Sequence, residues 1–312
     1  MRGGELRGTR HSGLRGAGRG RGADLERDLR RARVSIWSEV YLLTDRTVIR
    51  ALEDAVHRGV DVRVLLEAHP FGGGDISAAR TLEELQAAGV SARPANPVFR
   101  YTHEKALVVD AATAYILTSN LSRSGLGGSA SGANREYGVI DTDPRDVAQI
   151  AAIFMADWNH TTAVLDDPRL VVSPLNARAG LAALIGGAHA LLQIEDEEML
   201  DRLSEDLLIA AARRGVAVQI ILPAPGASTP DSSADVTRLS QGDVRVRYLV
   251  APYMHAKLVV ADGAVAFVGS ENFSSTSLDE NRELGITIGE PQALATLSHV
   301  YAQDWALASA PH

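Results

Sequence analysis

The sequence contains an internal duplication, which limits the possible folds more than any other feature. Residues 101–120 (YTHEKALVVDAATAYILTSN) have a counterpart in residues 253–272 (YMHAKLVVADGAVAFVGSEN). Three further landmarks recur in the same order: VHRGVDVRVLL with ARRGVAVQIIL, NREYGVI with NRELGIT, and the dipeptide Asp-Trp. Two copies of one plan predict two homologous repeats that pack with pseudo-two-fold symmetry.

Each half carries the pattern of a mixed α/β unit. Val48, Ile49 and Leu52 fall on one helical face, and Gly59 ends that helix before a β-rich run. The patterns predict helices at residues 25–33, 47–58, 81–88 and 144–158, and strands at 34–42, 60–66, 105–110, 114–118 and 136–141. The second half repeats the plan from residue 181 to residue 305. This order indicates an α/β fold in which each repeat is a mixed β-sheet flanked by helices.

The repeats divide the chain into three segments. Residues 1–23 are rich in Arg and Gly and are predicted to form a disordered tail. Residues 24–165 and 166–312 are predicted to be the first and second domains, because a polar stretch that contains proline, residues 161–174, separates the copies. Since both copies lie in one chain, no oligomer is required to complete a site.

The charge is distributed unevenly between the tail and the rest of the chain. The formal charge of the whole chain is −8, and residues 1–23 hold six Arg against one Glu. The remaining residues contain 25 basic and 38 acidic side chains, which gives them a formal charge of about −13. Non-specific binding of nucleic acid depends on neutralising phosphates. The acidic body therefore argues against nucleic acid as a partner, and the tail argues only weakly for it.

The sequence lacks the signals of membrane insertion and of metal binding. No apolar run approaches the ~20 residues of a membrane-spanning helix, and the N-terminus lacks the apolar region of a signal peptide. We therefore expect a protein that is cytoplasmic or bound peripherally to a membrane. Cys is absent, which excludes thiolate metal sites and Cys nucleophiles, and no pattern such as HExxH occurs. Neither a metal nor a cofactor is expected.

Only two of the nine histidines, His103 and His255, occupy matching positions in the two copies. Each is followed at similar spacings by the same residue types: Lys105 and Lys257, Asp110 and Asp262, Asn120 and Asn272, and Glu136 and Glu283. His and Lys two residues apart in a strand point to the same face, so each half directs a ring nitrogen and an ammonium toward one anion. Two halves packed face to face would gather two His, two Lys and two Asn around a single pocket.

These side chains suit the cleavage of a phosphodiester. Lys and Asn can stabilise the charge that develops on the non-bridging oxygens. One imidazole can attack phosphorus while the other protonates the leaving alkoxide, because a His pKa of about 6.5 permits either form near neutral pH. Each Glu is expected to accept a hydrogen bond from a ring nitrogen and to fix its tautomer.

The repeated H-x-K-x4-D pattern, followed by the stretches LTSN (117–120) and GSEN (269–272), resembles the phospholipase D superfamily. The resemblance covers nearly all of residues 25–312 and implies a covalent phosphohistidine at His103, with His255 as the general acid. It implies these further roles: phosphate binding by Lys105, Lys257, Asn120 and Asn272, orientation of the rings by Glu136 and Glu283, and structural roles for Asp110 and Asp262. Thr118 and Ser270 carry hydroxyls at matching positions and are predicted as secondary phosphate ligands.

We therefore predict a metal-independent phospholipase D-like phosphodiesterase that hydrolyses or transfers the phosphatidyl group of phospholipids at a membrane surface. Two enzymes of the same superfamily are alternatives: a phosphatidyl transferase of the cardiolipin synthase type, and a nuclease. Cardiolipin synthases commonly carry N-terminal membrane helices, of which the sequence shows none, and the acidic body disfavours a nuclease. A binding module with a degenerate site is the non-enzymatic alternative, and the intact residues disfavour it.

Overall fold

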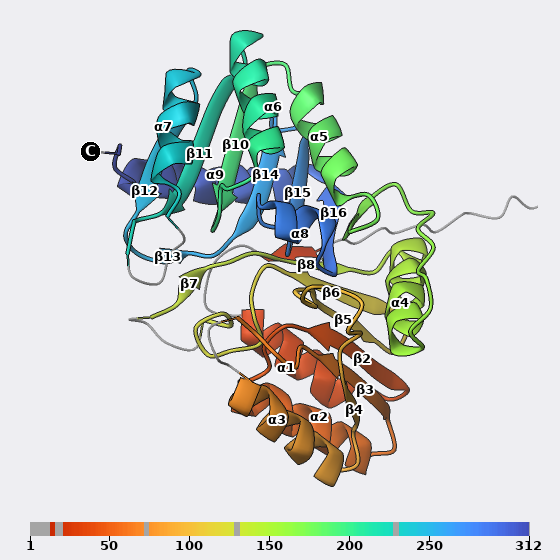
Figure 1. The fold of residues 1–312 in the computed structure, drawn as a ribbon. Helices are drawn as coiled ribbons and strands as arrows, with labels where there is room; N and C mark the ends of the chain where they lie inside the picture. Colours follow the sequence, from red (N-terminus) through yellow and green to blue (C-terminus); the bar gives the residue numbers. More distant parts are fainter. Residues whose placement is uncertain (1–12, 16–20, 72–74, 128–131, 227–230, 312) are drawn as a thin grey trace, which may run out of the picture.

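The computed structural model describes residues 13–15, 21–71, 75–127, 132–226 and 231–311, which form two halves built on one plan. The first half contains β1 (Gly13–Arg15), α1 (Arg21–Arg31), β2 (Ser35–Val40), α2 (Arg46–His57), β3 (Asp61–Leu66), α3 (Asp75–Ala87), β4 (Ser91–Pro94), β5 (Lys105–Val109), β6 (Thr113–Leu117), β7 (Asn134–Arg135), β8 (Gly138–Asp141) and α4 (Pro144–Trp158). The second half contains β9 (Leu170–Ser173), α5 (Ala177–Gly187), β10 (Leu191–Asp196), α6 (Arg202–Arg213), β11 (Ala217–Pro223), α7 (Ser233–Gln241), β12 (Arg245–Leu249), β13 (Tyr253–Met254), β14 (Lys257–Ala261), β15 (Val265–Gly269), α8 (Ser275–Asp279), β16 (Glu283–Ile288) and α9 (Pro291–Leu307). In Figure 1 the first half, red to yellow, lies below the second, green to blue.

Each half forms a seven-stranded mixed sheet. The first has the order β4-β3-β2-β5-β6-β8-β1, and the second has the matching order β12-β11-β10-β14-β15-β16-β9. The first three strands of each order are parallel, and the later pairs are antiparallel. The chain therefore consists of two homologous repeats, each a mixed sheet flanked by helices, packed with pseudo-two-fold symmetry as predicted.

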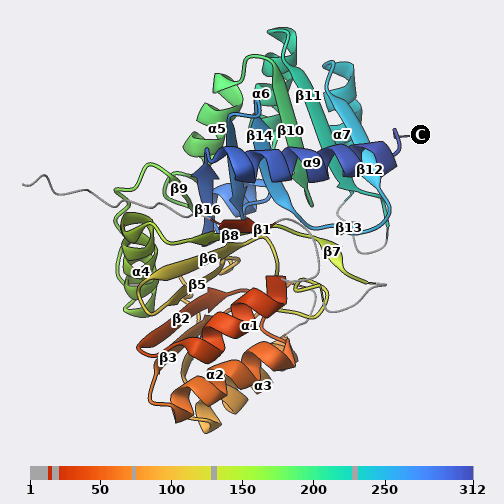
Figure 2. The same cartoon turned by 180° about the vertical axis from the view of Figure 1, so that it is seen from behind.

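The helices and sheets are arranged in layers around three large apolar cores, and a fourth, smaller cluster joins Leu65 to Phe154 and Trp158 of α4. Helices α1, α2 and α3 cover the outer face of the first sheet, and α5, α6 and α7 cover that of the second. The inner faces pack against each other in a third core, which also contains residues of α4 and α9. Figure 2 shows α9 across the face of the second sheet that is opposite to α5 and α6. This shared core holds the two halves in contact.

Matching residues begin and end the matching helices. The carboxylates of Asp45 and Asp201 accept hydrogen bonds from backbone N–H groups in the first turns of α2 and α6. After each helix the chain turns through a glycine with positive φ, +86° at Gly59 and +93° at Gly215, a conformation that residues with a Cβ rarely adopt. The turn directs the chain back into the parallel strand that follows, β3 or β11.

The structure adds strands that were not predicted from the sequence: the sheet strands β4 and β12, the short strands β7 and β13 between the halves, and the edge strands β1 and β9. Edge strand β9 pairs with β16 in the segment predicted to separate the domains, and β1 pairs in the matching way with β8. β1 and the start of α1 both lie within the predicted disordered tail, so the structure differs from that prediction at residues 13–15 and 21–23. Backbone pairing at a sheet edge needs no apolar side chains, which explains why the composition of residues 13–15 did not reveal β1. Residues 1–12 and 16–20 of the predicted tail lie outside the described residues.

Within the described ranges, no helix combines the length and the apolar character needed to cross a membrane.

Candidate active site

The backbone brings the two histidines together through pairings between the halves. The chain just before His255 pairs in parallel with the chain just before Glu136, as strands β13 and β7, which lie side by side in Figure 1. In the matching place Thr102 bridges to Arg282, beside His103 and Glu283. Each histidine therefore lies beside the glutamate of the other half.

Each histidine contacts that glutamate directly. Nδ1 of His103 lies 2.9 Å from Oε2 of Glu283, and Nδ1 of His255 lies 2.7 Å from Oε1 of Glu136. Burial alone would raise the pKa of both carboxyls, but contact with the adjacent histidine and the nearby lysine charge lower it, so both are ionised and can only accept hydrogen bonds. Nδ1 of each ring must then carry the hydrogen. This fixes the tautomer and leaves Nε2 for chemistry.

The glutamates are themselves held by neighbouring polar groups. Oε2 of Glu136 accepts a hydrogen bond of 2.6 Å from the Thr118 hydroxyl, and Oε1 of Glu283 accepts one of 2.7 Å from the Ser277 hydroxyl. The Ser270 hydroxyl accepts from the backbone of Leu284. Thr118 and Ser270 are fully buried and hydrogen-bonded within the protein, so their role as secondary phosphate ligands stays a prediction. The Thr118 hydroxyl thus orients the carboxylate of Glu136, and the Ser270 hydroxyl holds the backbone that follows Glu283.

Two lysines lie beside the histidines, as predicted. Nζ of Lys105 donates to the carbonyl oxygen of His103, and Nζ of Lys257 donates to that of His255 at 2.8 Å. Both lysines are buried. Burial lowers the pKa of Lys105 and of His103, and the charge of Lys257 acts in the same direction on both. The basic groups of both halves therefore share one site.

Asn120 and Asn272 follow β6 and β15, the strands adjacent to those that begin with the lysines. Within the described residues, Oδ1 of each side chain is buried and has no hydrogen-bond partner. The backbone N–H of Asn272 donates to Ser277, which in turn donates to Glu283. The structure gives neither amide a contact with a histidine or lysine side chain that would test its predicted role in phosphate binding.

Two ion pairs join the halves around the site. Arg282 contacts Asp157 of α4 at 2.8 Å through Nε, and Arg135 donates to Asp304 of α9 at 2.6 Å through Nη2. Each arginine pairs with the repeated Asp-Trp landmark of the other half. Because each arginine also directly precedes an orienting glutamate, these pairs fix the position of the chain at the site.

Asp110 and Asp262, the last residues of the motif, point away from the site. The carboxylate of Asp110 accepts from the backbone N–H groups of residues 33–35, and that of Asp262 accepts from residues 189–191. Asp110 therefore fixes the backbone at the start of β2, and Asp262 fixes the backbone at the start of β10. This agrees with the structural role expected for them.

Two residues of the site were not predicted. Val40 pairs with Lys105 across neighbouring strands, and Asp196 pairs with Lys257 in the same way. The residues that directly follow Val40 and Asp196 face the site. In the first half that residue is Tyr41, whose ring lies 4.7 Å from the His103 ring. In the second half it is Glu197, which contacts Lys257 and His255. The strand register identifies the two positions as equivalent, and the differing residue types concealed this in the sequence.

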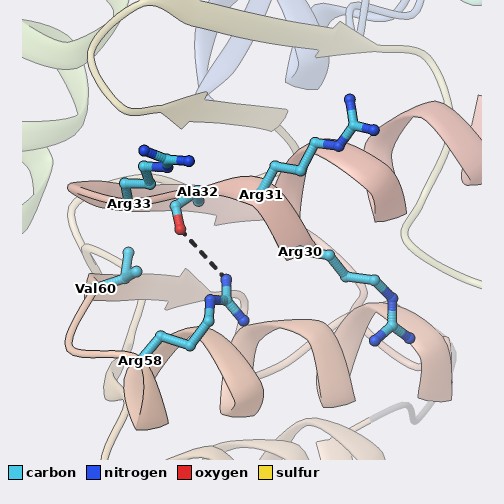
Figure 3. Close-up of a pocket in the computed structure, with 6 residues that line it drawn as sticks. All are labelled: Arg30, Arg31, Ala32, Arg33, Arg58 and Val60. Atoms are coloured by element: carbon cyan, nitrogen blue, oxygen red, sulfur yellow. Dashed lines mark hydrogen bonds between the residues drawn. The ribbon is translucent and has the colours of Figure 1, made fainter.

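A separate basic cavity of about 530 Å³ lies at the C-terminal end of α1. Its lining residues are Arg30, Arg31, Ala32, Arg33, Arg58 and Val60. Arg58 donates to the terminal carbonyl groups of α1, and Figure 3 shows Arg31 and Arg33 directed away from Arg30 and Arg58. The four charges do not converge, so this cavity is a weaker candidate than the histidine pair. In the part of the chain that the structure describes, no group of three or more His, Cys, Asp or Glu side chains is arranged to hold a metal ion.

The family model described as "Cardiolipin synthase, PLD-like domain" matches residues 25–158 and 181–305, one match in each half. The chain therefore belongs to the phospholipase D family, and it is an enzyme of that superfamily.

Individual relatives agree with this assignment. A probable cardiolipin synthase of Bacillus subtilis is 23% identical over 333 residues, which cover 90% of this chain and 63% of the relative. The chain thus spans less than two thirds of the length of that relative. Two solved structures share the fold. A polyphosphate kinase of Porphyromonas gingivalis has a TM-score of 0.73 and 16% identity, and the match covers 95% of this chain and 50% of that one. A phosphatidylserine synthase of Haemophilus influenzae has a TM-score of 0.70 and 14% identity, and the match covers 96% of this chain and 87% of that one.

Proposed function

We propose that the protein transfers a phosphatidyl group from one phospholipid to an alcohol group of another, the reaction type of a cardiolipin synthase. The observation that carries the proposal is the match of both halves to a family model described by that activity. The histidine–glutamate contacts between the halves support it, because they provide two imidazoles with fixed tautomers. Transfer therefore ranks ahead of hydrolysis, the reaction placed first on the sequence alone. We expect the protein to act peripherally, at a membrane surface.

In the first step, Nε2 of His103 attacks the phosphorus of the donor lipid. The N–P bond forms while the P–O bond to the leaving alcohol breaks, and the electron pair of that bond passes to the oxygen. Nε2 of His255 donates a proton to this oxygen. Lys257 retains one N–H after its bonds to Glu197 and to the His255 carbonyl, and with Lys105 it binds the non-bridging oxygens.

In the second step, the hydroxyl of the acceptor gives its proton to Nε2 of His255 and attacks phosphorus. The N–P bond breaks, and its electron pair returns to His103. Asn120 and Asn272 are proposed as further phosphate ligands, through their amide N–H groups. A lipid alcohol as acceptor gives a transfer product, whereas water gives phosphatidic acid.

The test is to incubate the purified protein with phosphatidylglycerol vesicles in EDTA and to identify the products. We expect cardiolipin and glycerol in equal amounts, and neither from the His103→Ala variant. Phosphatidic acid as the sole lipid product would replace transfer by hydrolysis. Cleavage of DNA without any lipid product would favour the nuclease alternative, and activity that needs a divalent ion would contradict the metal-independent mechanism.

A further inference from the structure

We infer that Glu197 is a positioning residue that keeps a proton on Nε2 of His255 and thereby makes His255 the acid of the first step. The inference rests on the two-step transfer proposed above. It concerns a residue outside the duplicated motif, at a position where the two halves differ.

The His255 ring has a carboxylate at each nitrogen. Nδ1 lies 2.7 Å from Oε1 of Glu136, and Nε2 lies 3.4 Å from Oε2 of Glu197. The 3.4 Å contact is an ion-pair distance, longer than an ordinary N–H···O hydrogen bond. A neutral ring with its hydrogen on Nδ1 would turn the lone pair of Nε2 toward the Glu197 carboxylate, whereas an imidazolium turns an N–H and a positive charge toward it. The geometry therefore favours the protonated ring, which is the form that an acid requires.

Other contacts hold Glu197 in this place. Its Oε2 accepts a hydrogen bond of 2.9 Å from Lys257, and its Oε1 accepts one of 3.1 Å from the Tyr253 hydroxyl. Burial alone would raise the pKa of Glu197, but the charges of His255 and Lys257 lower it well below its usual range, so the side chain is a carboxylate. Because these contacts are shorter than the one to His255, Nε2 can release its proton to the substrate while Glu197 stays in place.

Glu197 also offsets a charge that opposes protonation of His255. The charged groups facing the ring are Glu136 before β8, Glu197 after β10 and Lys257 at the start of β14. Nζ of Lys257 lies 3.5 Å from Nδ1, where a positive charge disfavours the imidazolium. Pairing of Lys257 with Glu197 reduces this repulsion.

The His103 side lacks such a carboxylate. Nδ1 of His103 contacts Glu283, but the equivalent of Glu197 is Tyr41, whose hydroxyl accepts a hydrogen bond from the backbone of Phe71. In the part of the chain that the structure describes, Nε2 of His103 has no hydrogen-bond partner. The neutral ring therefore presents a free lone pair on Nε2, as a nucleophile must.

The first arm of the test measures protonation without turnover. NMR spectra of the full-length protein with ¹⁵N-labelled histidine are recorded across pH for wild type and for Glu197→Gln. We expect His255 in the variant to lose its Nε2 proton about one pH unit lower than in wild type. Tyr41→Phe, which alters the equivalent position, is the matched control and should leave the His255 titration in place. An unchanged titration in folded Glu197→Gln would overturn the inference.

The second arm measures the role in the reaction with two esters of phosphatidic acid, one with glycerol and one with p-nitrophenol. Glu197→Gln should reduce turnover of the glycerol ester by roughly 10–100-fold and move the alkaline limb of its pH profile downward. Release of p-nitrophenol needs no proton and should change less than about threefold. Glu197→Asp should recover part of the loss. Equal losses with both esters would contradict the assigned role, whereas a wild type inactive on the glycerol ester would overturn the proposed function and leave the NMR arm to decide the inference.

Discussion

The two sides of the site carry one motif in different surroundings. Lys105 and Lys257 occupy matching positions, and both are buried. Burial lowers the pKa of Lys105 to about 7, and Lys257 adds to that effect. At Lys257 burial acts in the same direction, but Glu197 and Glu136 outweigh it and the pKa is raised. The largest opposing contribution comes from Glu197, whose equivalent in the first half is Tyr41.

The histidines differ in a related way. Burial lowers the pKa of His103 to about 4, with Lys105 and Lys257 acting in the same direction against Glu283, so the ring is neutral near pH 7. His255 has carboxylates at both nitrogens. The duplication supplied two equivalent sets of side chains, and a residue outside the motif makes them unequal. A repeated motif therefore does not require repeated roles.

The largest effect is expected from the orienting glutamates. Glu283→Gln and Glu136→Gln should each lower turnover of an unactivated phospholipid by roughly 10²–10⁴-fold, because each loses the acceptor that fixes a ring tautomer. With the p-nitrophenyl ester, formation of the intermediate should recover in Glu136→Gln, which affects the acid, but not in Glu283→Gln, which affects the nucleophile. Stopped-flow release of p-nitrophenol measures this. Recovery in both variants, or in neither, would remove the difference between the two sides.

A smaller effect is expected from the unequal lysines. Sulfate keeps its charge between pH 6 and pH 8 and can report anion binding as a competitive inhibitor. Its inhibition constant should rise by about tenfold over this range, as Lys105 loses its proton with a pKa of about 7. The rise should shrink in Lys105→Met. In Lys257→Met, which binds sulfate more weakly throughout, it should persist but move to higher pH, because the charge of Lys257 no longer lowers the pKa of Lys105. The same pH dependence in both variants would show that Lys105 is not the group that titrates.

The smallest effect on activity is expected where the halves are alike. Asp110→Ala and Asp262→Ala should each reduce the free energy of unfolding by about 1–2 kcal/mol, because each carboxylate accepts from consecutive backbone N–H groups. Turnover should stay within a few-fold of wild type. Denaturant unfolding measures the loss, with Asp110→Asn and Asp262→Asn as milder controls. A loss of activity that exceeds the loss of stability would place these carboxylates in the reaction.

The hydrogen bonds to Asp110 and Asp262 also predict a dependence on pH. Backbone hydrogen bonds lower the pKa of both carboxyls, against the effect of burial, in the folded state. A carboxyl with a lowered pKa contributes stability above its unfolded pKa of about 4, and loses it as the pH falls through the folded value. The gap between wild type and either alanine variant should therefore close below about pH 4.

The sequence predicted the features that depend on repetition. Alignment of the two halves was enough to single out His103, His255 and the two lysines, and the helical pattern of residues 144–158 matches α4. It could not show which glutamate serves which histidine, because that depends on backbone pairing between strands far apart in the chain. The sequence also left open the partners of Arg135 and Arg282, which lie in the other half.

The roles of individual side chains were harder to predict than their repetition. Thr118 and Ser270 were assigned to the phosphate because their hydroxyls match between the copies, but in both copies the hydroxyl accepts from the backbone N–H that follows an orienting glutamate, at Tyr137 or Leu284. Glu197 went unnoticed for the opposite reason, since its counterpart is a tyrosine and repetition gave no signal. Only the strand register, which pairs Asp196 with Lys257 and Val40 with Lys105, identifies the position.

The bond between His103 and phosphorus can be observed directly. The His255→Ala variant is mixed with the p-nitrophenyl ester of phosphatidic acid, quenched without acid, digested and mapped by mass spectrometry. The intermediate should accumulate, because the leaving group needs no proton while the second step lacks its base, and the phosphatidyl group should be found on His103. The same peptide should be unmodified in His103→Ala. Modification of another residue in His255→Ala, or of His255 in His103→Ala, would contradict the assignment, as would release of p-nitrophenol without any modified histidine.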